Sequence, residues 1–225
     1  GYQEILTDPS YAGQIITFTF PHIGNVGAND EDIETSNLAS TSGVRGMVIR
    51  ADITNPSNYR AAQHLDQWLK ARGIIGLSGI DTRALTRRIR EKGYVDGLIA
   101  HDPSGNFDIP ALLEKARGWP GMVGLDLVKD VTCGQSYTWN EARWKWGCGY
   151  EPGHELKHRV VAIDYGIKRN ILRLLTDAGC EVTVLPATAS AQDVLAREPD
   201  GIFLSNGPGD PAATGDYAVP VIREL

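Results

Sequence analysis

A loop rich in glycine and proline, Asn206-Gly207-Pro208-Gly209-Asp210, carries the clearest chemical signal in the sequence. It follows the apolar run 201–204, which predicts a strand, after one intervening residue, Ser205. Glycine lets the backbone approach a ligand closely, and proline fixes φ and has no N–H group. The N–H donors left in the turn belong to Gly207, Gly209 and Asp210. Such preset amides can stabilise an oxyanion, although a plain turn on a parallel sheet uses the same residue types.

The elements around this loop alternate between strand and helix. Apolar strands are predicted at 159–164, 181–185 and 201–204, with helices at 168–178 and 189–197. Short apolar strands separated by helices predict a parallel sheet with right-handed crossovers. Ligands bind such sheets beyond the carboxyl ends of the strands, and the loop at Gly207 lies at that edge.

The first part of the chain has a different pattern and is predicted to be rich in strands. Strands are expected at 14–20, 43–50 and 74–77, helices at 61–71, 83–92 and 109–117, and a final hairpin from 137–139 with Trp144 and Trp146. Asp81 or Thr82 can cap the second of these helices. Its Arg83, Arg87 and Arg90 share one face, which indicates either an anion or partner surface or a solvated basic face.

A polar segment with proline and glycine at 151–157 separates the two patterns and predicts a linker. We therefore expect an N-terminal domain at 1–150, a linker at 151–158 and a second domain at 159–225. The predicted fold class is α/β overall: a β-rich α/β domain followed by an incomplete parallel α/β domain.

Composition is that of an ordinary globular protein, with 42% hydrophobic and 22% charged residues. The net charge of −6 argues against a nucleic-acid partner. No apolar run approaches the roughly 20 residues of a membrane helix. Three widely spaced cysteines, Cys133, Cys148 and Cys180, favour a reducing compartment, and each is interpreted as non-catalytic. Cys148 stands in a Gly-Cys-Gly sequence, but no helix pattern follows it.

Several longer motifs, in order along the chain, resemble the carbamoyl-phosphate synthetase small-subunit family of class I glutamine amidotransferases. They are Gly1-Tyr2-Gln3-Glu4-Ile5-Leu6-Thr7-Asp8-Pro9-Ser10-Tyr11, Pro21-His22-Ile23-Gly24-Asn25-Val26-Gly27, Gly79-Ile80-Asp81-Thr82-Arg83, Asp164-Tyr165-Gly166-Ile167-Lys168-Arg169-Asn170 and the loop at Gly207. The similarity runs over essentially all 225 residues. It implies a flavodoxin-like second domain.

The resemblance also implies a reaction and its partners. The family hydrolyses glutamine through a cysteine thioester, and the ammonia passes to a large subunit that makes carbamoyl phosphate from bicarbonate and ATP for arginine and pyrimidine synthesis. Gly207 and Gly209 correspond to substrate-binding glycines. No metal or organic cofactor is implied for this chain, because ATP and divalent metal ions belong to the large subunit. A cytoplasmic location is expected.

The family's nucleophile, a cysteine in a G-x-C-x-G elbow, and its His and Glu partners have no counterpart in these residues. We therefore interpret the chain as a segment truncated at both ends, inactive by itself and without catalytic residues of its own. A non-catalytic interaction or regulatory module on the same scaffold is the alternative.

Overall fold

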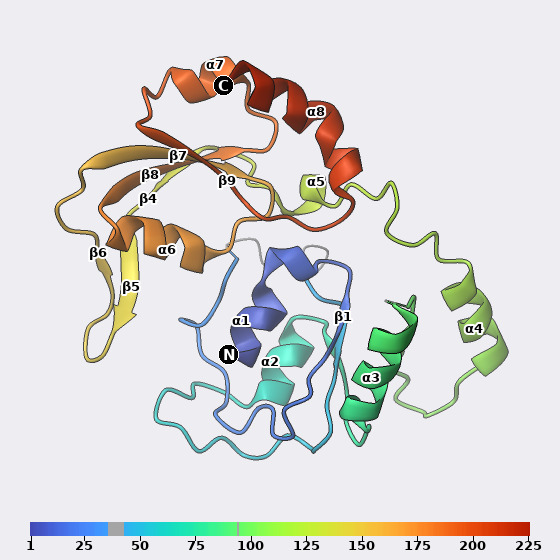
Figure 1. Cartoon of the computed structure of the whole chain (residues 1–225). Helices are drawn as coiled ribbons and strands as arrows, with labels where there is room; N and C mark the ends of the chain where they lie inside the picture. The colour runs from blue at the N-terminus through green and yellow to red at the C-terminus, as the bar shows by residue number, and fades with distance from the viewer. Residues whose placement is uncertain (36–42, 94) are drawn as a thin grey trace. The chain divides into compact units, whose positions relative to one another are not determined.

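The computed structural model describes residues 1–35, 43–93 and 95–225 (Figure 1). The described residues fall into two compact units. The first comprises those among 1–7, 13–33 and 38–121, and the second those among 8–12, 34–37 and 122–225. Both contain helices and parallel strands, so the predicted α/β class is confirmed.

The first unit is built on a parallel sheet of three short strands in the order β1-β2-β3. The strands are β1 (Ile15–Thr17), β2 (Gly46–Val48) and β3 (Ile75–Leu77), and the helices are α1 (Tyr2–Thr7), α2 (Leu65–Ala71), α3 (Thr82–Lys92) and α4 (Ile109–Arg117). Met47 and Trp68 are fully buried in its core. The strands at 14–20 and 43–50 were predicted too long.

Two helix starts in this unit follow from local hydrogen bonds. Asp81, one of the two caps that the sequence allows, caps α3, because its carboxylate accepts a bond from the Ala84 N–H at 3.1 Å. Helix α2, which was predicted to start at residue 61, begins only at Leu65. The backbone of Gln63 is bridged to Ala28 instead, so this stretch is not available to a helix.

The second unit contains a four-stranded sheet in the order β4-β8-β7-β9. The strands are β4 (Tyr137–Trp139), β7 (His158–Asp164), β8 (Cys180–Pro186) and β9 (Gly201–Leu204); the helices are α5 (Val128–Val131), α6 (Arg169–Asp177), α7 (Ala191–Leu195) and α8 (Pro211–Glu224), with a 3-10 turn η1 at Pro9–Tyr11. β8, β7 and β9 are parallel, as the alternating pattern predicts.

Helices cover both faces of this sheet, with α6 on one side and α7 and α8 on the other (Figure 1). Along β7, Val161 and Ile163 pack into the core that also holds Val194 and Ala218, whereas Ala162 packs into the core that holds Leu172. Because both faces of β7 are covered in this part of the strand, residues 160–163 are continuously apolar rather than alternating.

The predicted hairpin from 137–139 is wrong in its pairing. β4 pairs antiparallel with β8, and the hairpin is instead formed by β5 (Glu141–Lys145) and β6 (Gly149–Pro152). Arg173 of α6 packs against this hairpin: its guanidinium lies 3.6 Å from the ring centre of Tyr150. The pairing was missed because β4 and β8 are far apart in the sequence.

The sequence places the domain boundary at 150 and a linker at 151–158, whereas the compact units divide after Gly121. The pairing of β4 with β8 explains this difference. Trp139 of β4 is buried in the core of the second unit. Residues 122–150 therefore pack with the parallel sheet, although their sequence pattern resembles that of the first part.

We predict that trypsin cleaves after Lys115 or Arg117 before it cleaves after Lys157. α4 contains no buried residue, so it opens at little cost, whereas the Lys157 N–H donates to the Gly179 carbonyl at 2.7 Å, next to β7. Mass spectrometry of the first fragments measures the order. First cleavage after Lys157 would instead support a flexible linker at 151–158.

Candidate functional site

Gly207 lies at the carboxyl edge of the parallel sheet, in the loop between β9 and α8. It is exposed, and its N–H donates no hydrogen bond to any residue that the structure describes. A Cβ built on Gly207 would lie 2.3 Å from the Tyr165 carbonyl oxygen, which no real side chain tolerates. The position therefore needs glycine for close packing, and it keeps an exposed residue whose N–H is unused by the described residues.

Gly209 also makes a close backbone approach, to the segment that precedes α5. Its φ is +84°, and an added Cβ would lie 2.4 Å from the Leu125 carbonyl oxygen. Its N–H, like that of Gly207, bonds to none of the residues described. The buried Pro208 stands between the two glycines. The loop therefore presents two unused amides from a backbone that has little freedom to move.

Asp210 does not contribute the third amide that the sequence suggests. Its N–H donates to the Leu125 carbonyl at 2.9 Å. Its carboxylate accepts bonds from the N–H of Gly124 at 2.7 Å and of Ala212 at 2.9 Å, which also caps α8. Hydrogen bonds to the charged form lower the pKa of Asp210. Asp210 therefore anchors the loop and is not a ligand donor.

The neighbouring loop after β7 is held by the buried carboxylate of Asp164. It accepts bonds from the N–H groups of Cys133 at 2.8 Å, Gly166 at 2.9 Å and Ile167 at 2.7 Å. The Tyr165 N–H, in turn, donates to the Ser205 hydroxyl at 2.8 Å. These bonds fix the backbone against which Gly207 packs.

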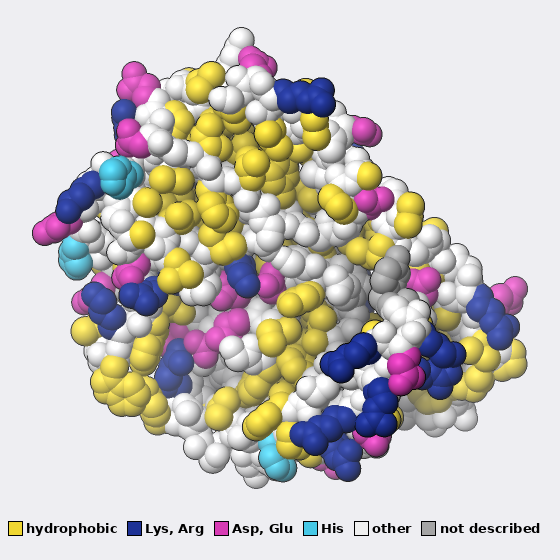
Figure 2. All heavy atoms as spheres, viewed as in Figure 1, with side chains coloured by type: hydrophobic (Ala, Val, Ile, Leu, Met, Phe, Trp, Pro, Cys, Tyr) yellow, Lys and Arg dark blue, Asp and Glu magenta, His cyan; other side chains and the backbone are white. Residues whose placement is uncertain are grey.

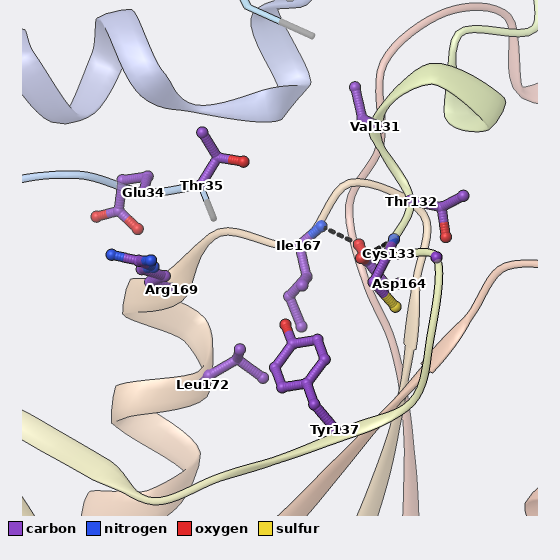
Figure 3. A pocket seen from close by; sticks show the side chains of 11 residues that line it. Glu34, Thr35, Val131, Thr132, Cys133, Tyr137, Asp164, Ile167, Arg169 and Leu172 are labelled. Atoms are coloured by element: carbon purple, nitrogen blue, oxygen red, sulfur yellow. Dashed lines mark hydrogen bonds between the residues drawn. The ribbon is translucent and has the colours of Figure 1, made fainter. Parts of the chain in front are cut away.

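A pocket of about 390 Å³ lies beside Asp164 and was not predicted from the sequence (Figure 3). Its eleven lining residues are Glu34, Thr35, Val131, Thr132, Cys133, Gly134, Tyr137, Asp164, Ile167, Arg169 and Leu172. The hydroxyl end of Tyr137 points into it, between Ile167 and Leu172 (Figure 3). Neither Gly207 nor Gly209 lines this pocket, so it is separate from the exposed amides.

Burial raises the pKa of three ionisable groups that line the pocket. Burial, reinforced by the charge of Asp164, raises the pKa of the Cys133 thiol to about 12 and also raises the pKa of Tyr137. Burial raises the pKa of Glu34, although the Asn170 N–H donates to its carboxylate at 2.7 Å. Cys133 is therefore a thiol at neutral pH, which is the wrong form for a nucleophile.

The other cysteines are located as the sequence predicts. Cys148 is exposed in the turn between β5 and β6, and Cys180 begins β8 and packs against the core that contains Leu172. Among the described residues, no three His, Cys, Asp or Glu side chains are grouped to hold a metal ion.

The basic face of α3 is exposed, and Lys and Arg side chains gather over this helix in Figure 2. Arg83, Arg87 and Arg90 form no ion pair with the described residues. Both interpretations of this face, a partner surface and a solvated one, remain predictions.

Comparisons with known proteins agree with the motifs. Residues 1–99 match the family described as carbamoyl-phosphate synthase small chain, CPSase domain, and residues 161–225 match glutamine amidotransferase class-I. The whole chain is 67% identical to the carbamoyl phosphate synthase small chain of Bradyrhizobium diazoefficiens, of which it covers 57%. The chain belongs to the carbamoyl phosphate synthase small chain family. The Rhizobium meliloti and Brucella canis small chains are 66% and 64% identical, and the chain covers 57% and 55% of them.

The chain thus spans a little over half the length of these small chains. The two family matches leave residues 100–160 between them. In the part of the chain that the structure covers, no helix is long and apolar enough to cross a membrane.

We predict that Gly207→Ala destabilises the second unit, because the new Cβ would force the loop away from the Tyr165 carbonyl. Overpacking of this kind costs about 1–3 kcal/mol of unfolding free energy. Gly134→Ala is the matched control, since nothing lies within 4 Å of a Cβ at Gly134. Chemical denaturation measures both, and equal stability of the two variants would contradict the packing described.

We predict that iodoacetamide at pH 8 modifies Cys148 well before Cys133. Cys148 is exposed, whereas a pKa of about 12 leaves only about one Cys133 thiol in 10⁴ ionised at that pH. Peptide mass spectrometry over time gives the order. Faster labelling of Cys133, or its stoichiometric capture by a glutamine-analogue electrophile, would show that it is a reactive thiolate.

Proposed function

We propose that the protein containing this chain is the glutamine-hydrolysing small chain of a carbamoyl phosphate synthase. It acts in the cytoplasm and hydrolyses glutamine to glutamate and ammonia. The ammonia passes to a large chain, which makes carbamoyl phosphate from bicarbonate and ATP for arginine and pyrimidine synthesis. ATP and its divalent metal ions bind the large chain. Family membership and the names of the relatives support this proposal.

The observation that carries the proposal is the exposed Gly207 with its unused N–H. When a thiolate attacks the amide carbon of glutamine, the carbonyl oxygen becomes an oxyanion, and ammonia leaves as the thioester forms. A donor that is already aimed at this oxygen stabilises the transition state without reorganising. Gly207 is assigned this role, and Gly209 is assigned to holding the glutamine.

The nucleophile is assigned to a part of the protein outside these 225 residues. Cys133 is held as a thiol, Cys180 is partly buried against the core that contains Leu172, and Cys148 lies in a hairpin turn. None of them follows a strand and begins a helix in the manner of a nucleophile elbow. The 225 residues by themselves are therefore expected to have no glutaminase activity.

A graft provides the test. Residues 1–225 replace the matching segment of the Bradyrhizobium diazoefficiens small chain, and the product is assembled with the large chain of that organism. We predict that Gly207→Ala lowers the glutamine-dependent rate by a factor of about a hundred to a thousand. The ammonia-dependent rate should change less than twofold, because free ammonia bypasses the small chain.

Gly134→Ala is the control in this graft and should leave both rates unchanged. Equal losses of the two rates in Gly207→Ala, measured on assembled complex, would contradict the oxyanion role. A graft that supports ammonia-dependent but not glutamine-dependent synthesis would contradict the glutaminase assignment and favour a non-catalytic scaffold.

A further inference from the structure

The hydrogen-bonded side chains of Asn206 and Ser10 have no role in the function proposed above. We infer that Asn206 is a positioning residue that acts with Ser10 and orients the Gly207 amide toward the reacting oxygen. This inference rests on the proposed glutaminase function. Three observations support it: the hydrogen bonds of the Asn206 side chain and backbone, the buried Asn206 Oδ1 without a partner, and the contact with Ser10 from a distant segment.

The side-chain amide of Asn206 joins the loop to its surroundings. Its Nδ2 donates to the Gly166 carbonyl at 3.2 Å and to the hydroxyl of Ser10. Gly166 in turn lies against Gly207, since a Cβ on Gly166 would be 3.3 Å from the Gly207 Cα. These bonds therefore hold Asn206, the residue directly before the proposed donor Gly207, to the same backbone against which Gly207 packs.

The backbone of Asn206 is held as well. Its carbonyl accepts a bond from the Ser205 hydroxyl at 2.7 Å, and that hydroxyl also accepts the Tyr165 N–H. On the other side, the Asp210 N–H bonds to Leu125. The peptide unit that carries the Gly207 N–H is thus restrained at the Asn206 carbonyl, which is part of the same planar group.

Stability alone does not account for an asparagine here. Its Oδ1 is buried and has no hydrogen-bond partner among the described residues. A buried carbonyl oxygen without a donor reduces stability. The reverse orientation of the amide would be worse, because Oδ1 would then face the Gly166 carbonyl oxygen. A buried polar atom without a partner calls for an explanation other than stability, and a positioning role for Asn206 supplies one.

Ser10 brings a distant part of the chain to the loop, since 196 residues separate it from Asn206. The 3-10 turn that carries Ser10 is capped by Asp8, whose carboxylate accepts the Ser10 N–H at 2.9 Å. Lys168 lies 3.4 Å from the same carboxylate, at the start of α6. Residues 8–12 are therefore held to the second unit and complete the support of the Gly207 loop.

The test uses the grafted complex with Asn206→Ala. We expect kcat for glutamine to fall by about tenfold to a hundredfold, since small displacements of a catalytic donor have effects of that size. KM for glutamine and the ammonia-dependent rate should each stay within threefold. Hydrogen exchange of the peptide containing Ser205 and Asp210 should become faster.

Further variants separate positioning from general damage. Ser10→Ala should lower kcat in the same direction by less, because Asn206 keeps its bond to Gly166. Asn206→Asp keeps the size but replaces the donor with a carboxylate facing the Gly166 carbonyl, so its loss should be at least that of Asn206→Ala. Asn140→Asp makes the same change on an exposed side chain and should alter nothing.

The inference is overturned if exchange of the loop peptide is unchanged in Asn206→Ala. It is also overturned if exchange rises while kcat with glutamine does not fall, or if the glutamine and ammonia rates fall together. If the unmodified graft lacks glutaminase activity, the proposed function fails, and the inferred role in catalysis fails with it. Faster exchange in Asn206→Ala would in that case identify Asn206 as a structural support only.

Discussion

The buried carboxylate of Asp164 is the constraint on which the site depends. Its two oxygens accept three backbone N–H groups, from Cys133, Gly166 and Ile167, so a single side chain joins the loop after β7 to the segment before β4. A buried carboxylate is tolerated only when such donors surround it. Because these bonds hold Gly166 and Ile167, and Ser205 holds the Tyr165 N–H, the loop at Gly207 packs on a hydrogen-bonded backbone.

That rigid surface gives the glycines two functions at once. The Tyr165 and Leu125 carbonyl oxygens leave no room for a side chain at Gly207 or Gly209, while the N–H groups of both glycines bond to none of the described residues. A tight turn and an oxyanion donor are therefore compatible in this loop. The packing is what presets the donor, so that no reorganisation is needed when negative charge develops on a substrate oxygen.

Local signals in the sequence predict local structure well. β9 and α4 have the bounds predicted, and Asp81 caps α3, because strand periodicity and caps depend on neighbouring residues. Pairings over long distances were missed. The partner of β4, the bond that occupies the Asp210 N–H and the contact of Ser10 with Asn206 depend on residues far away in the chain, and no local pattern encodes them. The glycine loop could be found from the sequence, but its supports could not.

A crystal structure of the grafted complex with glutamate γ-semialdehyde bound is the most direct test of the central claim. This aldehyde forms a tetrahedral adduct with an active-site thiolate and leaves an oxygen where the oxyanion develops. The account predicts that the Gly207 nitrogen lies about 2.7–3.1 Å from that oxygen, with the loop unchanged. An oxygen bound elsewhere, with the Gly207 N–H still unpaired, would contradict it.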